Sequence, residues 1–89
     1  MNESERTLFE EFQNQGINLG GEPTWENCRK WLWEREWRIN VLSDYPRDEV
    51  KFTVRRGFER IEFMGRSDLE VMAKAILEVN RRQAANPED

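Results

Sequence analysis

The side chains that usually carry catalysis and metal binding are scarce in this chain. It contains no histidine, which removes the usual general base, the usual zinc ligand and the usual switch near neutral pH. Its single cysteine, Cys28, has no histidine to activate it and cannot form an internal disulfide. Carboxylates are plentiful, but nothing in their spacing singles out a catalytic pair. We therefore expect a protein that is not an enzyme and that holds no metal or cofactor.

Tryptophan is the residue type in this sequence best suited to anchoring another protein. Three of the four tryptophans lie in the stretch CRKWLWEREWRINVLS. Helical spacing places Trp25, Cys28 and Leu32 on one face, which should meet a core. Trp31 and Trp33 then fall on opposite sides of that face, roughly 160° apart. We expect at least one of this pair to be exposed and to contact a partner; the alternative, of about equal weight, is that both fill a small core.

The stretch VKFTVRRGFERIEF is typical of a β-hairpin. A two-residue turn at Arg56-Gly57 supplies the backbone freedom that a tight turn requires. The register then pairs Arg55 with Phe58, Thr53 with Arg60, Phe52 with Ile61, Lys51 with Glu62 and Val50 with Phe63. It gathers four apolar side chains on one face of the hairpin and matches opposite charges on the other.

The tip of this hairpin collects three arginines and one phenylalanine on the face that we expect to lie opposite the core. Arginines beside an aromatic ring can grip phosphates and stack on bases, or they can anchor a protein interface. The alternative is a solvated surface on which Arg55 covers Phe58 through a cation–π contact. The candidate partner-binding residues are therefore Trp31, Trp33, Arg55, Arg56, Phe58 and Arg60.

Caps and hydrophobic periodicity predict the helices. The first should begin at Ser4 as its cap and end near Gln15, with Gly16 at C′ and Ile17 as the accompanying hydrophobic contact. The second begins after the cap residue Thr24 and continues to about Glu36. The last begins with a capping box, Ser67 and Glu70, and its apolar residues at helical spacing are Leu69, Met72, Ala73, Ile76 and Leu77.

A strand period takes over at Trp37, where Trp37, Ile39 and Val41 alternate with polar residues. The loop SDYPRDE should join this strand to the hairpin. We thus predict an α+β fold in the order α-α-β-β-β-α, a three-stranded antiparallel meander with helices packed on one face. Residues 1–83 would form a single domain, and residues 84–89 a frayed tail.

The net charge of −4 is unevenly distributed. Residues 1–27 hold six glutamates against Arg6 alone, whereas residues 28–89 are nearly balanced. The acidic first third repels nucleic acid and suits a basic partner surface, or it is simply a solvated helix face. Neither a long apolar stretch nor a signal-peptide pattern occurs, so we expect a cytoplasmic protein without membrane contact.

The order of one helix, three strands and one helix resembles the double-stranded RNA-binding domain. That family places a lysine-rich segment at the start of its final helix, where this chain has Asp68 and Glu70. RNA binding is therefore not carried over.

Residues 6–36 resemble the opening of many small phage and prophage accessory proteins. RTLFEEFQ matches their Phe-Glu helix, and TWENCRKWLWERE matches the Trp-rich helix that follows it. In those proteins the second helix ends near a Trp-x-x-Arg pattern. Here Trp33, Glu34 and Arg35 come close to that pattern without matching it fully. The resemblance implies a protein that binds and blocks a host protein, and it transfers no functional residue.

Together these features predict a small non-enzymatic interaction protein, phage-encoded, that binds a host bacterial protein and modulates or inhibits it. The alternative is a nucleic-acid-binding module that uses the Arg-rich hairpin tip. A homodimer is compatible with either function.

Overall fold

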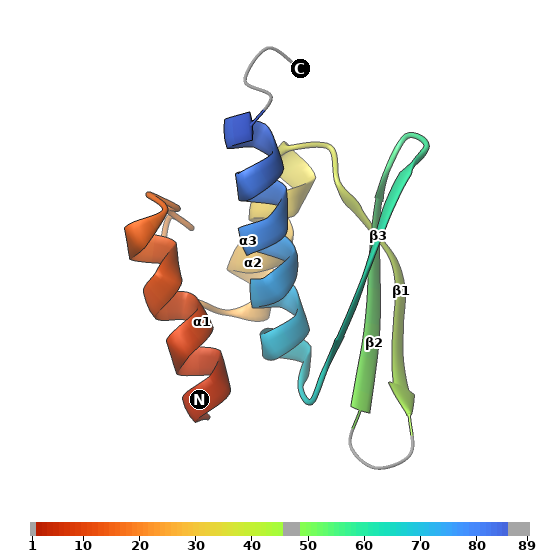
Figure 1. The fold of residues 1–89 in the computed structure, drawn as a ribbon, viewed down its shortest axis with the longest axis horizontal. Helices are drawn as coiled ribbons and strands as arrows, with labels where there is room; N and C mark the ends of the chain where they lie inside the picture. Colours follow the sequence, from red (N-terminus) through yellow and green to blue (C-terminus); the bar gives the residue numbers. More distant parts are fainter. Residues whose placement is uncertain (1, 46–48, 86–89) are drawn as a thin grey trace.

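The computed structural model describes residues 2–45 and 49–85, and it has the predicted α+β architecture. Three helices and a three-stranded antiparallel sheet follow one another in the predicted order α-α-β-β-β-α (Figure 1). Their bounds are α1 Glu3–Asn14, α2 Trp25–Glu34, β1 Arg38–Tyr45, β2 Glu49–Arg56, β3 Glu59–Gly65 and α3 Asp68–Ala85.

The helices all lie on one side of the sheet, as predicted. Figure 1 shows α3 between α1 and the sheet, with α2 behind α3. The strand order is β1-β2-β3, and α3 packs on β2 and β3 while it also contacts α1 and α2. We call the sheet face toward α3 the inner face and the opposite one the outer face. Among the described residues, no helix is both long and apolar enough to cross a membrane.

The first helix begins two residues earlier than predicted and ends as predicted. Asn2, not Ser4, is the cap, because its side chain accepts a hydrogen bond from the backbone of Glu5 while the Glu5 carboxylate accepts one from the backbone of Asn2. At the other end Gly16 has φ +70°, and the N–H of Ile17 donates to the carbonyl of Phe12 at 2.8 Å. This is the Schellman ending that the Gly-Ile pair indicated.

The second helix is capped by Thr24, as predicted, and ends at Glu34. Its ending is also a Schellman motif, but Glu36 occupies the left-handed position, with φ +68°. The N–H of Glu36 donates to the carbonyl of Trp33, and the N–H of Trp37 donates to that of Leu32. Glutamate rarely adopts this conformation, so the sequence located the end of the helix only approximately.

The alternation predicted for β1 is wrong beyond Ile39. Ile39 pairs with Val54, but Val41 pairs with Thr53, which leaves Asn40 as the extra residue of a β-bulge. Because the bulge reverses the alternation, Val41 lies on the outer face instead of the inner one.

The hairpin register is shifted by two residues from the prediction. The turn residues are Gly57 and Phe58, and Arg56 pairs with Glu59 instead of forming the turn. Phe52 consequently pairs with Phe63, and Val54 with Ile61. Because strand side chains have a period of two, the same apolar residues still face inward. Lys51 reaches Glu62 diagonally, with 3.1 Å between Nζ and Oε2.

The last helix begins as predicted but with a different partner for Glu70. The Ser67 hydroxyl accepts from the N–H of Glu70, whereas the Glu70 carboxylate accepts from the N–H of Arg66 at 2.9 Å. The helix continues to Ala85, beyond the predicted start of the tail at residue 84. Residues 86–89 of that predicted tail, and residues 46–48 of the predicted SDYPRDE loop, lie outside the described residues.

The core is built around α3, which is apolar on most of its circumference. Its buried apolar residues are Val71, Met72, Ala73, Ala75, Ile76 and Val79. The predicted stripe was too narrow, because it omitted the buried Val71, Ala75 and Val79. Two of its members, Leu69 and Leu77, are only partly buried. The sheet contributes Val50, Phe52 and Val54, while the other helices contribute Phe12, Cys28, Trp31 and Leu32, and Trp37 closes the α2–β1 connection.

Phe52→Ala and Ile76→Ala should each lower the free energy of unfolding by about 2–5 kcal/mol, the range for large-to-small changes in a packed core. Both side chains are fully buried, one on β2 and the other on α3. Urea unfolding curves measure the loss. Leu42→Ala is the control, because Leu42 is 40% exposed and its removal should cost less than about 1 kcal/mol. Near-complete stability of either core variant would contradict the packing of α3 on the sheet.

Glu36→Gly should stabilise the protein by about 0.5–1 kcal/mol. A left-handed conformation costs a non-glycine residue about 1–2 kcal/mol, and the greater backbone freedom of glycine in the unfolded chain offsets about half of that gain. Glu36 is exposed, so little packing is lost. The midpoint of urea unfolding should rise at constant m-value. Gly16→Ala places a side chain at the equivalent position of α1 and should have the opposite effect.

Candidate interaction surface

The two candidate tryptophans of α2 have different environments, as their helical spacing predicted. Trp33 is 56% exposed, whereas Trp31 is 3% exposed and belongs to the core. The guanidinium of Arg35 covers the Trp31 ring at 3.7 Å from its centroid and donates to the Trp31 carbonyl. Trp31 therefore cannot contact a partner directly, and Trp33 is the exposed indole of the pair.

Arg38, the first residue of β1, holds the exposed indole in place. Its guanidinium lies 3.5 Å from the Trp33 ring centroid, and Nη1 donates to the carbonyls of Trp33 and Trp37. The bond to the Trp33 carbonyl supplies a donor at the C-terminal end of α2, where helix carbonyls lack partners within the helix. The contact therefore links the end of α2 to the start of the sheet.

Three arginines form a row across the outer face of the sheet. Arg38 is the cross-strand partner of Arg55, and Arg55 is that of Arg60. All three are exposed, and none of them forms an ion pair within the described part of the chain. Like charges placed directly opposite destabilise a sheet. This row thus concentrates positive charge at a cost in folding stability.

The other two candidate residues near the hairpin tip, Phe58 and Arg56, have different environments. Phe58 lies in the turn and is fully exposed. Arg56 does not share the outer face with its neighbours, contrary to the prediction, because it continues the inward alternation of Val50, Phe52 and Val54. Its guanidinium lies 5.0 Å from the Trp37 ring centroid, and Nη2 pairs with Glu59 at 2.9 Å. Arg56 thus acts within the protein.

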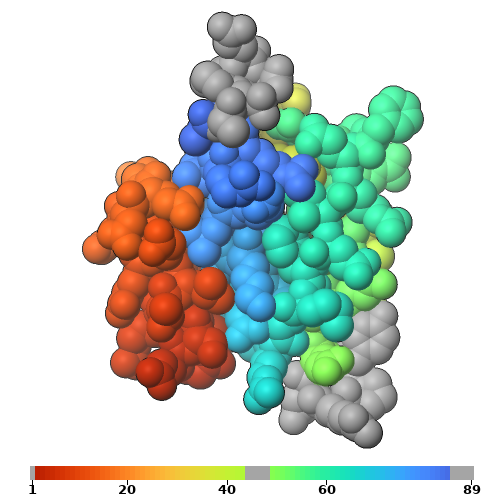
Figure 2. All heavy atoms as spheres, in the orientation of Figure 1, coloured from red at the N-terminus to blue at the C-terminus, as the bar shows by residue number. Residues whose placement is uncertain are grey.

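The structure brings the remaining candidates together into one strip. We define the Trp33–Phe58 surface as Trp33, Arg38, Arg55, Arg60 and Phe58. Arg38 connects the two groups of residues that the sequence suggested separately, and sequence reasoning missed it. The pairing of β1 with β2 is the signal that places Arg38 opposite Arg55. Figure 2 shows α1 and the β-sheet on opposite sides of α3 in that view, so the acidic α1 lies away from this strip.

Two hollows flank the Trp33 indole. The Trp37 cavity, of about 130 Å³, is lined by Arg29, Leu32, Trp33, Trp37, Arg38 and Ile39. The Lys30 hollow, of about 200 Å³, is lined by Glu26, Arg29, Lys30 and Trp33. The buried indole Nε1–H of Trp37 has no hydrogen-bond partner among the described residues. A buried donor left unpaired costs about 1–3 kcal/mol.

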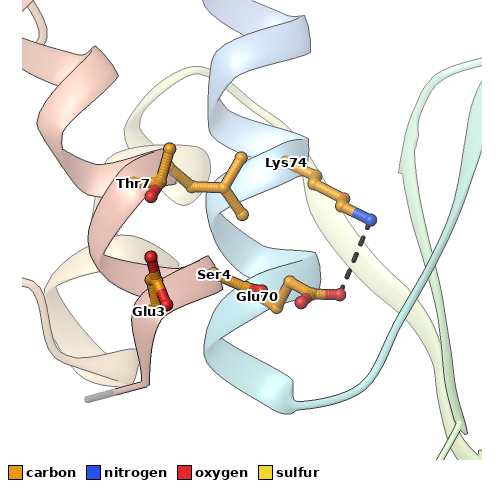
Figure 3. A pocket seen from close by; sticks show the side chains of 6 residues that line it. Glu3, Ser4, Thr7, Glu70 and Lys74 are labelled. Carbon is orange, nitrogen blue, oxygen red and sulfur yellow. Dashed lines mark ion pairs between the residues drawn. The ribbon is translucent and has the colours of Figure 1, made fainter.

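In a third hollow, between α1 and α3, the charged groups of α3 are bound within the protein. Figure 3 shows Glu70 and Lys74 of α3 beside Glu3, Ser4 and Thr7 of α1. Lys74 pairs with Glu70 at 3.5 Å and donates to the carbonyl of Met64 at 2.8 Å. The Glu70 carboxylate is also bound to the Arg66 backbone. These contacts attach the start of α3 to the end of β3, and we assign them a structural role.

Cys28 is unsuited to nucleophilic chemistry. Its side chain is fully buried in the core, and burial raises the pKa of the thiol to about 12. The thiol therefore stays protonated at neutral pH, whereas a nucleophilic cysteine acts as its thiolate. Within residues 2–45 and 49–85, no three acidic, cysteine or histidine side chains group so as to hold a metal ion.

Comparison of the chain with protein-family models, curated proteins and solved structures found no match. The likeness to the double-stranded RNA-binding domain rests on the order of elements alone. The likeness to phage accessory proteins rests on residues 6–36 alone.

An ion-pair network joins the hairpin end to the last turns of α3. Arg56 pairs with Glu59, Glu59 with Arg82, and Arg82 with Glu78. Hydrogen bonds from Arg81 and Arg82 lower the pKa of the Glu78 carboxyl from 4.5 to about 2. Because this pKa is lower in the folded state, the stabilisation is complete above about pH 4.5 and is lost as the pH falls toward about 2.

Glu78→Gln should lower the free energy of unfolding by about 1 kcal/mol at pH 7. The difference from the unaltered protein should shrink as the pH falls through the lowered pKa of about 2, because Glu78 itself is half protonated at that pH and largely protonated below it. Urea unfolding of both proteins at pH 7 and near pH 2 measures the loss of stability and its dependence on pH. Glu26→Gln is the control, since its carboxylate lies 4.0 Å from Arg29 on the exposed surface. An equal loss at both pH values would show that the charge of Glu78 is not the cause.

Proposed function

We propose that this chain is a small non-enzymatic interaction protein that binds a protein partner through the Trp33–Phe58 surface and thereby modulates or inhibits it. The observation that carries the proposal is the joining of a half-exposed indole, a row of three arginines and a fully exposed phenylalanine into one strip. Tryptophan and arginine are among the residues most enriched at the energetic centres of protein interfaces, and phenylalanine is enriched in interfaces relative to the rest of the surface.

The charge distribution supports an acidic partner surface. The strip presents Arg38, Arg55 and Arg60, and the acidic α1 lies on the other side of α3. A partner that docks on the strip therefore does not face α1. Complementary charge favours association and excludes like-charged partners. The resemblance of residues 6–36 to phage accessory proteins supports a host bacterial protein as the target.

The arginine row also favours a second candidate, a nucleic-acid-binding module. Exposed arginines beside Phe58 suit phosphates and stacked bases. The net charge of −4 works against this function, since it opposes the approach of a polyanion. A titration with labelled single-stranded and duplex oligonucleotides distinguishes the two, because affinity that depends on phosphate contacts falls steeply with salt concentration.

Trp33→Ala and Phe58→Ala should each weaken partner binding by about 2 kcal/mol or more, the cost of losing an interface hot spot. Both side chains are largely exposed, so stability should change little. The measurement is quantitative capture of proteins from bacterial lysate on the immobilised chain, followed by titration with the captured partner.

Met64→Ala is the matched control, because Met64 is 44% exposed on the outer face beyond the arginine row. It should leave binding unchanged. Equal capture by Trp33→Ala, Phe58→Ala and Met64→Ala would place the interface elsewhere. Tight, salt-sensitive oligonucleotide binding that is lost on Arg55→Glu would instead favour the nucleic-acid function.

A further inference from the structure

The Trp37 cavity is built where the end of α2 meets the start of β1. Leu32, Trp37 and Ile39 form its apolar part, and Arg29 and Arg38 supply its charge. Its volume of about 130 Å³ corresponds to roughly four water molecules at about 30 Å³ each. Sites for cofactors and drug-sized ligands start at about 300 Å³. The cavity therefore fits the end of one side chain.

The cavity offers hydrogen-bond donors and no acidic side chain. The hydrogen bonds of Arg38 use only Nη1, so Nε and Nη2 are free to bind within the described part of the chain. Among the residues that the structure describes, the one ion pair of Arg29 is the exposed contact with Glu26 at 4.0 Å. Two guanidinium groups without an acidic side chain beside them in the cavity complement an anionic acceptor of this size.

We propose that the Trp37 cavity binds one side-chain carboxylate, from an aspartate or glutamate of the partner protein. This inference rests on the proposed function, and it names the group that the partner inserts beside Trp33. Arg29 and Arg38, which line the cavity, bind the carboxylate oxygens. A guanidinium binds a carboxylate through two parallel hydrogen bonds, which gives this contact direction as well as charge.

A partner carboxylate fits these surroundings better than a nucleic-acid phosphate. The cavity is a single pocket rather than a groove that could follow a backbone. A peptide segment that crosses the Trp33 indole can insert its carboxylate on one side and rest an uncharged residue on the other.

The test follows the indole N–H signal of Trp37 by NMR while the whole protein is titrated at constant ionic strength. The probes are glutamate blocked at both ends, glutamine blocked in the same way, and inorganic phosphate. Blocked glutamate should shift the Trp37 signal saturably, with a dissociation constant in the millimolar range, and blocked glutamine should not. Arg29→Gln should weaken glutamate binding by about three- to tenfold, since it removes one charged donor.

Lys30→Gln is the matched control, because Lys30 lines the Lys30 hollow and not the Trp37 cavity. It removes the same charge one residue away and should leave the affinity unchanged. Two results would overturn the proposal. One is a Trp37 signal that blocked glutamate does not move. The other is phosphate acting at lower concentration than glutamate, which would make this a phosphate site.

Failure of this site can be told apart from failure of the proposed function. If Trp33→Ala abolishes partner capture while Arg29→Gln has no effect and glutamate does not bind, the interface stands and the carboxylate site is rejected. If Trp33→Ala leaves capture unchanged, the proposed function fails, and the titration still reports on the cavity by itself.

Discussion

The α3 helix carries buried side chains around most of its circumference. Other elements must therefore pack against α3 on more than one side. The sheet does so through β2 and β3, and α1 and α2 do so from the other side. A domain of 89 residues buries little surface beyond one such core. All three helices are consequently used on the inner face, and the outer face of the sheet is left without a covering layer.

The burial of Trp37 in the core also determines how the chain reverses direction between α2 and β1. Trp37 must enter the core directly after the helix ends, and the left-handed conformation of Glu36 makes that turn. The same turn places Trp33, one helical turn back, on the surface, and it brings Arg38 over the Trp33 ring. A core requirement thus fixes the position of the exposed indole, and it forms the neighbouring cavity between the helix and the strand.

Arginine has two uses in this fold, and the distinction defines the candidate surface. Arg35 and Arg56 lie over the buried Trp31 and Trp37, where their stems and planar groups cover aromatic rings and contribute to stability. Arg38, Arg55 and Arg60 lie side by side without carboxylate partners among the described residues, which opposes folding. Binding of an acidic surface would relieve that repulsion, and this is the physical reason to place an interface there.

The sequence by itself determined the class and order of the elements, since caps such as Thr24 and Ser67 and the Gly16 ending are local signals. Helical spacing also separated Trp31 from Trp33. The sequence did not determine the hairpin register, because a shift by two residues leaves every side chain on the same face of the sheet. It also did not determine the bulge at Asn40, because no characteristic residue pattern marks such a bulge. Only the tertiary structure brought Arg38 between Trp33 and Arg55. Residues distant in sequence become neighbours through strand pairing. Which strands pair depends on the burial of their inward-facing apolar side chains in one core.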